Sequence, residues 1–221
     1  MRLGHFGISI CGAILASALT VQASFAALAI TEVASTSGAT ELELAGLDWW
    51  ELTNTGPGSV LLDGYEWEDN NPQGAGVDTA IFPNGVSVAA GESIIIHQGD
   101  NTADAAFRAA WGLSASVQIL TEDLFGGNNT FSGLSSNGDQ LRVYDPMGAE
   151  IAMVDFPSST SGITFEWDRA GNSLGLSVAG ENGAYAISEG RVGSPGTSVP
   201  EPATLALLGL AASCLVGTRR R

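Results

Sequence analysis

Acidic and amide side chains are the residues of this chain with the most obvious capacity for chemistry. One group comprises Glu66, Glu68, Asp69, Asn70 and Asn71, and a second comprises Asp100, Asn101 and Asp104. Calcium takes about six to eight oxygen ligands, which loops rich in Asp and Asn can supply. Neither group has the spacing of an EF-hand, and Asp and Asn also favour turns for local backbone reasons. The sequence therefore leaves two interpretations open, a calcium site and ordinary turns.

Signs of catalysis are scarce. His97 is the only histidine after the N-terminal leader, and a lone histidine is more often structural than catalytic. The sequence contains no His-Glu-x-x-His zinc motif, no phosphate-binding loop and no dinucleotide fingerprint. The numerous carboxylates could form a glycosidase-like pair in space, but the sequence alone does not identify one. We therefore expect a protein that is not an enzyme and that uses no cofactor.

Five aromatic residues could stack against carbohydrate rings: Trp49, Tyr65, Trp67, Trp111 and Trp167. Tryptophan and tyrosine also fill the cores of β-sandwiches, where they bury large apolar areas. Side chains alternate along a strand, so Trp49 and Trp50 point to opposite faces. One of these two is expected to face solvent or to cover an edge. For the set as a whole, we favour a core role over a carbohydrate platform.

The charge of the chain is strongly negative. Its formal net charge is -16, and all eight basic residues are arginines. Residues 27–200 contain four arginines and 23 acidic residues, which gives this segment a charge of -19. Such a surface repels phosphate backbones and anionic lipid headgroups, so we expect no nucleic-acid partner. The two cysteines, Cys11 and Cys214, lie in terminal apolar segments, which excludes disulfides and Cys-based zinc sites from the region between them.

The N-terminus has the three parts of a secretory signal peptide. Arg2 is followed by a mostly apolar run from Phe6 to Val21 and then by the small residues Ser24 and Ala26. This pattern predicts that signal peptidase removes residues 1–26 by cutting between Ala26 and Ala27. The alternative is a retained membrane anchor, although the run is shorter than the ~20 residues of a membrane-spanning helix.

A second apolar segment lies at the C-terminus. Val199, Pro200, Glu201 and Pro202 precede an apolar stretch from Ala203 to Gly217, and the chain ends in three arginines. A helix over this stretch would be about 22 Å long at ~1.5 Å per residue, which is thin for a hydrocarbon core of ~30 Å. Terminal arginines favour the cytoplasmic side, so the preceding domain is expected outside the cytoplasm. The predicted signal peptide requires the same orientation.

The order of these C-terminal parts resembles the PEP-CTERM sorting signal. The resemblance covers residues 199–221, which comprise the motif, a short transmembrane helix and an Arg-rich terminus. It implies recognition by an exosortase, a membrane enzyme that cuts near the motif and releases the protein to the exterior. The expected location is transient anchoring in the inner membrane with the domain in the periplasm, followed by the cell surface or the extracellular space. An ordinary tail-anchored protein is the alternative.

Between the two ends, short apolar segments alternate with clusters of Gly, Asn, Asp, Ser and Pro, a pattern typical of an all-β sandwich or barrel. Predicted strands cover 28–34, 59–67, 93–97, 117–120 and 163–168, and a hairpin covers 140–156 with a turn at Asp145–Gly148. Gly64 suggests a bulge or a close backbone approach. A short helix is predicted over Thr102–Trp111, with Asn101 or Thr102 as its N-cap and Gly112 as its stop, crossing one end of the sandwich.

Several of these segments resemble the lamin-tail domain, in the order in which that family has them. The matching segments are 28–33, 48–56, 62–65, 82–85, 90–92, 134–139 and 193–196. The resemblance extends over essentially the whole mature domain, residues 27–198, and implies an immunoglobulin-like β-sandwich. Two stretches depart from the family pattern, a longer acidic loop at 66–79 and an insertion at 125–132.

Together these features predict an all-β, immunoglobulin-like β-sandwich with one short helix, flanked by a signal peptide and a C-terminal hydrophobic helix. We expect an exported, exosortase-processed protein of the cell surface or extracellular matrix that binds rather than catalyses, in an exopolysaccharide or biofilm setting. Signal peptidase and exosortase are the expected processing partners, and the candidate ligands are extracellular polysaccharide, another protein and calcium. The alternative is a secreted metal-dependent hydrolase or nuclease with an acidic site that the sequence does not reveal.

Overall fold

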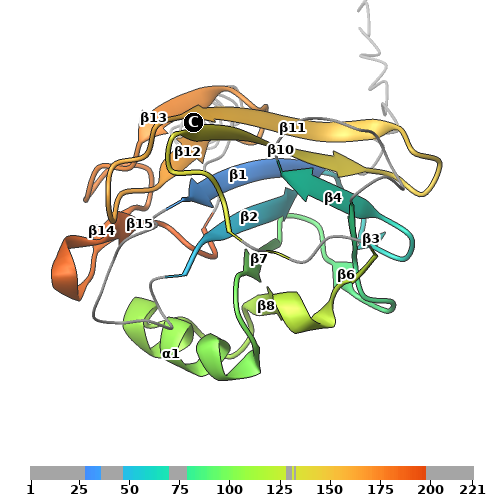
Figure 1. Ribbon diagram of the computed structural model, residues 1–221, viewed down its shortest axis with the longest axis horizontal. Helices are drawn as coiled ribbons and strands as arrows, with labels where there is room; N and C mark the ends of the chain where they lie inside the picture. The colour runs from blue at the N-terminus through green and yellow to red at the C-terminus, as the bar shows by residue number, and fades with distance from the viewer. Residues whose placement is uncertain (1–27, 36–46, 70–78, 128–130, 132, 198–221) are drawn as a thin grey trace, which may run out of the picture.

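The computed structural model describes residues 28–35, 47–69, 79–127, 131 and 133–197. In this part of the chain, β-strands form two packed sheets, and one α-helix lies against the outside of the first sheet (Figure 1). The predicted signal peptide, its cleavage site and the sorting motif lie outside the described residues. No helix within the described ranges is long and apolar enough to cross a membrane.

The first sheet contains six strands in the order β13-β12-β1-β2-β7-β8. Their bounds are Ser173–Leu176 (β13), Phe165–Trp167 (β12), Leu28–Ala34 (β1), Trp49–Asn54 (β2), Ser93–His97 (β7) and Gln118–Thr121 (β8). Neighbouring strands are antiparallel except β7 and β8, which are parallel. The register of β1 against β2 shifts between Ile30 and Glu32. This bulge lets both Thr31 and Glu32 reach the outer face of the sheet, where Glu51 also lies.

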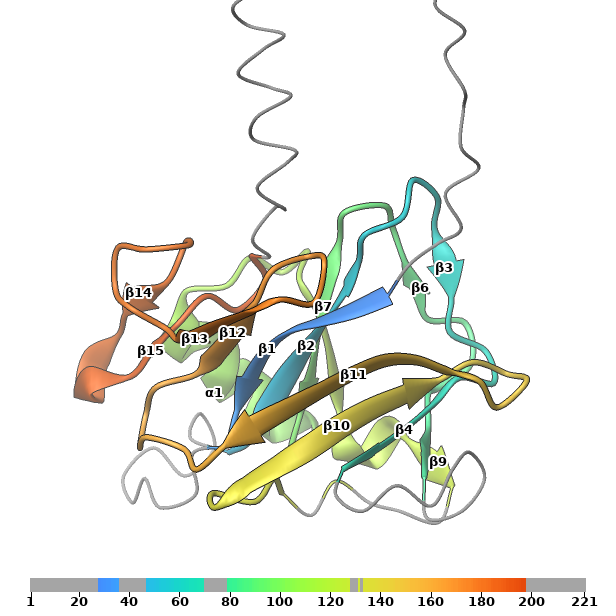
Figure 2. The ribbon, with the colours of Figure 1, turned by 90° about the horizontal axis from the view of Figure 1, so that it is seen from above.

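The second sheet contains five strands in the order β11-β10-β4-β5-β9. Their bounds are Glu150–Pro157 (β11), Gly138–Tyr144 (β10), Glu66–Asp69 (β4), Ala80–Ile81 (β5) and Gly126–Gly127 (β9). Two short pairs complete the strands, β3 (Val60–Leu61) with β6 (Ser87–Val88), and β14 (Tyr185–Ala186) with β15 (Val192–Gly193). Two single turns of 3-10 helix lie at Glu122–Leu124 and Ser188–Gly190. Figure 2 shows β10 and β11 lying across β1 and β2.

The main core fills the space between the two sheets. Trp50 of β2 meets Trp67 of β4 edge to face, with ring centroids 5.4 Å apart, and Trp67 meets Phe131 at 5.1 Å. Edge-to-face contacts of this kind add to the large apolar area that aromatic residues bury. On β11, Val154 and Phe156 point into this core, and the residues between and beside them face outward, as the alternation of side chains along a strand requires. The two sheets and their shared core form the predicted immunoglobulin-like β-sandwich.

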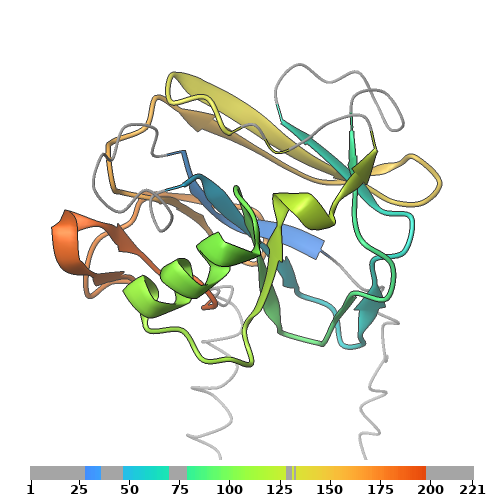
Figure 3. The same ribbon diagram turned by 60° about the horizontal axis from the view of Figure 1, so that its bottom comes forward.

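The helix α1 (Asn101–Trp111) covers the outer face of the first sheet (Figure 1 and Figure 3). It packs Phe107 and Trp111 onto Trp49 of β2, with ring centroids 5.5 and 6.0 Å away, and Ile95 of β7 joins this second cluster. The expectation that one of the neighbouring tryptophans faces solvent or covers an edge is therefore wrong. Both are buried, because α1 provides a second apolar layer behind the sheet.

The prediction of a helix is confirmed, with two corrections. Its N-cap is Asp100, whose side chain accepts a hydrogen bond from the backbone N–H of Thr102, rather than Asn101 or Thr102. The helix also lies on a sheet face instead of crossing an end of the sandwich, because its apolar side matches the outward side chains of β2 and β7. Gly112 ends the helix in the left-handed region, at φ 64°, as predicted.

The predicted strand over 59–67 is interrupted in the structure. Its first part is β3 and its last part belongs to β4, with a turn between them in which Gly64 has φ 75°. This positive φ is readily accessible to glycine and explains the break. The hairpin over 140–156 is confirmed as β10 and β11, and its turn is closed by a 2.8 Å hydrogen bond from the Gly148 N–H to the Asp145 carbonyl.

Candidate functional site

The acidic groups that suggested calcium are engaged by protein partners. Glu66 accepts a hydrogen bond from the Thr79 hydroxyl at 2.7 Å, and Glu68 accepts one from the Tyr144 hydroxyl. Asp100 caps α1, where hydrogen bonds from Thr102 lower the pKa of its carboxyl. Asp104 pairs with Arg108 one turn later on the helix, at 2.7 Å.

In the described parts of the chain, no three or more His, Cys, Asp or Glu side chains are placed so that they could hold a metal ion together. Asn70 and Asn71, which belong to the first acidic group, lie outside those parts. Local backbone and side-chain roles therefore account for the carboxylates of Glu66, Glu68, Asp100 and Asp104.

His97 is enclosed beneath α1. Its ring centroid lies 4.6 Å from that of Phe107, and neither ring nitrogen has a hydrogen-bond partner. Burial without a charged partner lowers the pKa of His97 to about 4, so the imidazole is neutral at physiological pH. A general acid or base must reach its substrate, and this ring is fully buried. The structure therefore supports the structural interpretation of His97.

The candidate carbohydrate platform does not form. The tryptophans at 49, 67, 111 and 167 are all buried, and Tyr65 is half-buried against the main core. Trp111 additionally packs against the ring of Tyr185, whose hydroxyl donates to the Trp111 carbonyl at 2.5 Å. A stacking platform requires exposed ring faces, so these aromatic residues are core residues.

One hydrolase-like motif was missed by sequence reasoning. Residues 171–175 read Gly-Asn-Ser-Leu-Gly, which fits the Gly-x-Ser-x-Gly pattern of the nucleophile elbow. That elbow is a strand-to-helix turn, whereas these residues form the hairpin turn from β12 to β13 and the start of β13. Ser173 is exposed, and the only histidine of the described residues is enclosed under α1. The pattern therefore has neither the backbone context nor the base of a serine hydrolase.

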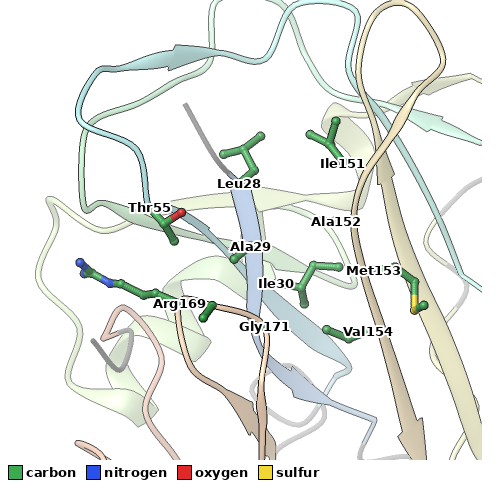
Figure 4. Close-up of a pocket in the computed structure, with 11 residues that line it drawn as sticks. Leu28, Ala29, Ile30, Thr55, Ile151, Ala152, Met153, Val154, Arg169 and Gly171 are labelled. Atoms are coloured by element: carbon green, nitrogen blue, oxygen red, sulfur yellow. The ribbon is translucent and has the colours of Figure 1, made fainter. Parts of the chain in front are cut away.

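A groove of about 380 Å³ lies between the start of β1 and the edge strand β11 (Figure 4). Apolar side chains of β1 and β11 face each other across it, and the turn after β12 closes one side. Its lining residues with polar side chains are Thr55 and Arg169, and Arg169 donates a 3.3 Å hydrogen bond to the Gly91 carbonyl at the rim. No carboxylate, histidine or cysteine lines the groove. The groove could hold a ligand but offers no acid–base pair or nucleophile.

Three glutamates form a carboxyl cluster on the outer face of the first sheet. Glu32, Glu51 and Glu166 lie on adjacent strands, with Glu32 opposite each of the other two in the register. Their exposed fractions are only 1%, 0% and 2%, so each carboxyl depends on protein hydrogen bonds. Burial, and the neighbouring charge of Glu51, raise the pKa of Glu32 well above its usual range, and burial raises the pKa of Glu51.

Sequence reasoning did not find the carboxyl cluster. The residues alternate with apolar neighbours in their strands, which for a sheet with one covered face predicts exposure on the solvent side. They are buried because residues 177–197 fold back over this face and contact all three carboxyls. The one available signal was the glycine-rich segment 193–196, which could allow the backbone to approach a surface closely.

Two family models match the chain. The Lamin Tail Domain model matches residues 22–158, and the PEP-CTERM protein-sorting motif matches residues 198–221. A search of curated proteins finds no match. The sorting motif begins directly after the last described residue, Thr197, and secretion follows from this signal. The first model covers more than half of the chain and agrees with the observed sandwich, so the chain belongs to the lamin tail domain family.

Proposed function

We propose that this chain is an exported, exosortase-processed component of the cell surface or extracellular matrix that acts as a binding or structural module. The observation that carries the proposal is the position of the sorting motif immediately behind a closed β-sandwich. The Gly196 N–H is still bonded to Glu51 of the sheet, and Val199 is only three residues further along. The arrangement suits a folded cargo carried by a short processing tail.

A non-catalytic role is supported by the state of the reactive side chains. His97 is buried and neutral, and the described carboxylates of the two acidic groups have structural partners. The groove beside β11 lacks acid–base groups. Binding of an extracellular polysaccharide or protein therefore fits the domain better than hydrolysis does. The charge of -19 over residues 27–200 argues against nucleic acid as the ligand.

The proposal is tested by locating the protein in the source bacterium. Cells producing the full chain are compared with cells producing a chain that stops after Ser198 and with cells producing a Glu201→Ala variant. We expect the full chain to be retained at the surface or in the matrix, and both altered chains to lose that location. Equal distribution of all three forms among the inner membrane, outer membrane, matrix and medium would contradict exosortase sorting.

The hydrolase or nuclease alternative is tested on the purified secreted protein. Polysaccharide, protein and DNA substrates are incubated with it, with and without millimolar calcium, magnesium or a chelator. We expect no turnover under any of these conditions. Turnover that the chelator abolishes would instead establish a metal-dependent enzyme.

A further inference from the structure

The last described segment, Val192–Thr197, lies across the outer face of the first sheet, and we call it the strap. Its beginning is paired through the backbone, because the Thr164 N–H donates to the Val192 carbonyl at 3.1 Å. Beyond that point the strap is held by carboxyls. The Ser194 N–H donates to Glu32 Oε1, and the Gly196 N–H donates to Glu51 Oε2, each at 2.7 Å. The strap therefore depends directly on the carboxyl cluster.

The strap approaches the cluster too closely for ordinary side chains. A Cβ at Gly193 would lie 2.7 Å from Glu32 Oε1 and 3.0 Å from Thr164 Cγ2. Gly196 has φ 80°, in the region that favours glycine. The two glycines allow the backbone to present its N–H groups to the buried carboxyls.

The number of hydrogens available around the Ser194 hydroxyl indicates that one of the two neighbouring glutamates carries a proton. The Ser194 hydroxyl oxygen lies 3.1 Å from Glu32 Oε2 and 3.2 Å from Glu166 Oε1. A hydroxyl has one hydrogen to donate, whereas an ionised carboxylate can only accept. Both contacts are full hydrogen bonds only when one of the two glutamates is protonated and donates to the hydroxyl oxygen.

The surrounding charges favour that proton. Glu32 faces Glu51 on β2 and Glu166 on β12, and both negative charges raise the pKa of Glu32 in addition to its burial. Tyr185 of β14 also faces Glu32, and the pKa of its phenol is raised by burial and by that carboxylate. The single cationic residue of segment 177–197 is Arg191, whose side chain lies against Gly162. Three ionised carboxylates enclosed together would repel one another.

We propose that the strap is a proton-dependent clamp, in which a proton on Glu32 is donated to the Ser194 hydroxyl, which in turn donates to Glu166 and holds Val192–Thr197 on the sheet. Loss of this proton leaves mutually repelling carboxylates in a buried site, and opening of the strap relieves the repulsion by admitting water. The strap is therefore closed below the pKa at which this proton is lost and opens as the pH rises through it.

The strap directly precedes the sorting motif in the sequence, so opening of the clamp affects how the motif is connected to the folded domain. Val199 begins the sorting motif three residues after the anchored Gly196. At about 3.5 Å per extended residue, the motif starts within roughly 10 Å of the folded domain while the strap is closed. Opening the strap would lengthen this connection. The link to sorting rests on the proposed function, whereas the clamp itself does not.

Hydrogen exchange of the full chain in detergent micelles tests the clamp. Deuterium uptake of peptides covering 192–197 is measured by mass spectrometry from pH 6 to pH 9, with exchange times scaled for the intrinsic pH dependence. We expect protection of the strap to fall by up to about tenfold per pH unit once the proton is lost. Peptides of the β10–β11 hairpin serve as the internal reference and should keep their protection.

Glu166→Gln is the decisive variant. Its amide N–H₂ can donate permanently to the Ser194 hydroxyl, and its carbonyl oxygen can accept from Asn182 as Glu166 does now. The strap of this variant should stay protected up to pH 9. Glu181 is an exposed glutamate of segment 177–197 that lies outside the strap. Glu181→Gln is therefore the matched control and should behave like the wild type.

Ser194→Ala provides a second, independent variant. Without the bridging hydroxyl, strap protection at pH 6 should already be at least tenfold lower than in the wild type. The proposal is overturned if wild-type strap protection changes less than twofold between pH 6 and pH 9, or if Glu166→Gln loses protection as the wild type does. Because none of these measurements uses cleavage, failure of the clamp is distinguishable from failure of exosortase sorting.

Discussion

At the scale of single residues, burial decides what the titratable side chains do. His97 and the carboxyl cluster both lie on the outer face of the first sheet, yet their titrations affect stability with opposite signs. The folded state disfavours protonation of His97, so acid weakens the fold through this residue. The folded state favours protonation of Glu32 and Glu51, so their contribution to stability is lost as the pH rises through their raised pKa values.

Replacing His97 by leucine removes the contribution of this residue to the loss of stability in acid. The pKa of His97 is about 4 in the folded protein and 6.5 in a free side chain, so the unfolded chain takes up the proton first as the pH falls. Wild-type stability should therefore decline between about pH 6.5 and pH 4, by up to roughly 3 kcal/mol at ~1.4 kcal/mol per pKa unit.

The leucine variant should lack this decline, as measured by urea unfolding at half-unit steps of pH. The comparison at pH 7.5, where the imidazole is neutral in both folded and unfolded states, controls for the change in packing. If the two proteins lose the same free energy of unfolding between pH 6.5 and pH 4, His97 is not the acid-sensitive group.

At the scale of elements, α1 covers part of the outer face of the first sheet, so that this sheet buries apolar side chains on both of its faces. Phe107 and Trp111 of α1 meet outward residues of β2 and β7, so the first sheet is apolar under the helix and carboxyl-rich under the strap. The strap and the helix thus cover neighbouring parts of one face with different chemistry. This division explains why Trp49 and Glu51, two residues apart on the same side of β2, are both buried.

Trp49→Ala tests the docking of the helix. The side chain is buried between the sheet and α1, so its removal should cost about 3–5 kcal/mol of the free energy of unfolding. Trp49→Phe keeps an aromatic ring in the site and should cost less than half as much. A carbohydrate platform makes the contrary prediction, with unchanged denaturant unfolding of Trp49→Ala and lost polysaccharide binding.

The sequence predicted elements best where local patterns are strong. The helix and the β10–β11 hairpin were found to within a few residues, because helical spacing, Gly112 and the Asp145–Gly148 turn are local signals. The break at Gly64 and the burial of Trp49 depend on contacts with distant segments, which periodicity does not reveal. The same limit hid the carboxyl cluster, since Glu32 and Ser194 are separated by 162 residues.

At the scale of the whole molecule, the domain extends beyond the part that the family model matches. The match ends at residue 158, yet β12 pairs with β1 in the first sheet, and Phe165 and Trp167 enter the main core. Phe165 lies 5.9 Å from Phe156 of β11, measured between ring centroids. The segment 159–197 therefore closes both the core and the outer face of the sandwich.

Truncation tests this closure. A chain comprising residues 27–158 would expose the β1 edge and the apolar surface that Phe165 and Trp167 cover. We expect it to lack a cooperative thermal transition, whereas residues 27–197 should unfold in a single transition. Cooperative unfolding of the shorter chain at a melting temperature within about 5 °C of the longer one would show that 159–197 is dispensable.

The proposed export route predicts where the mature chain begins and where it ends. The intact mass of the protein isolated from the surface or matrix of the source bacterium measures both ends at once. We predict a chain that begins at Ala27 and ends close to Pro202, without the apolar stretch 203–217. A mass that includes Met1, or one that continues through Arg221, would contradict export with exosortase processing.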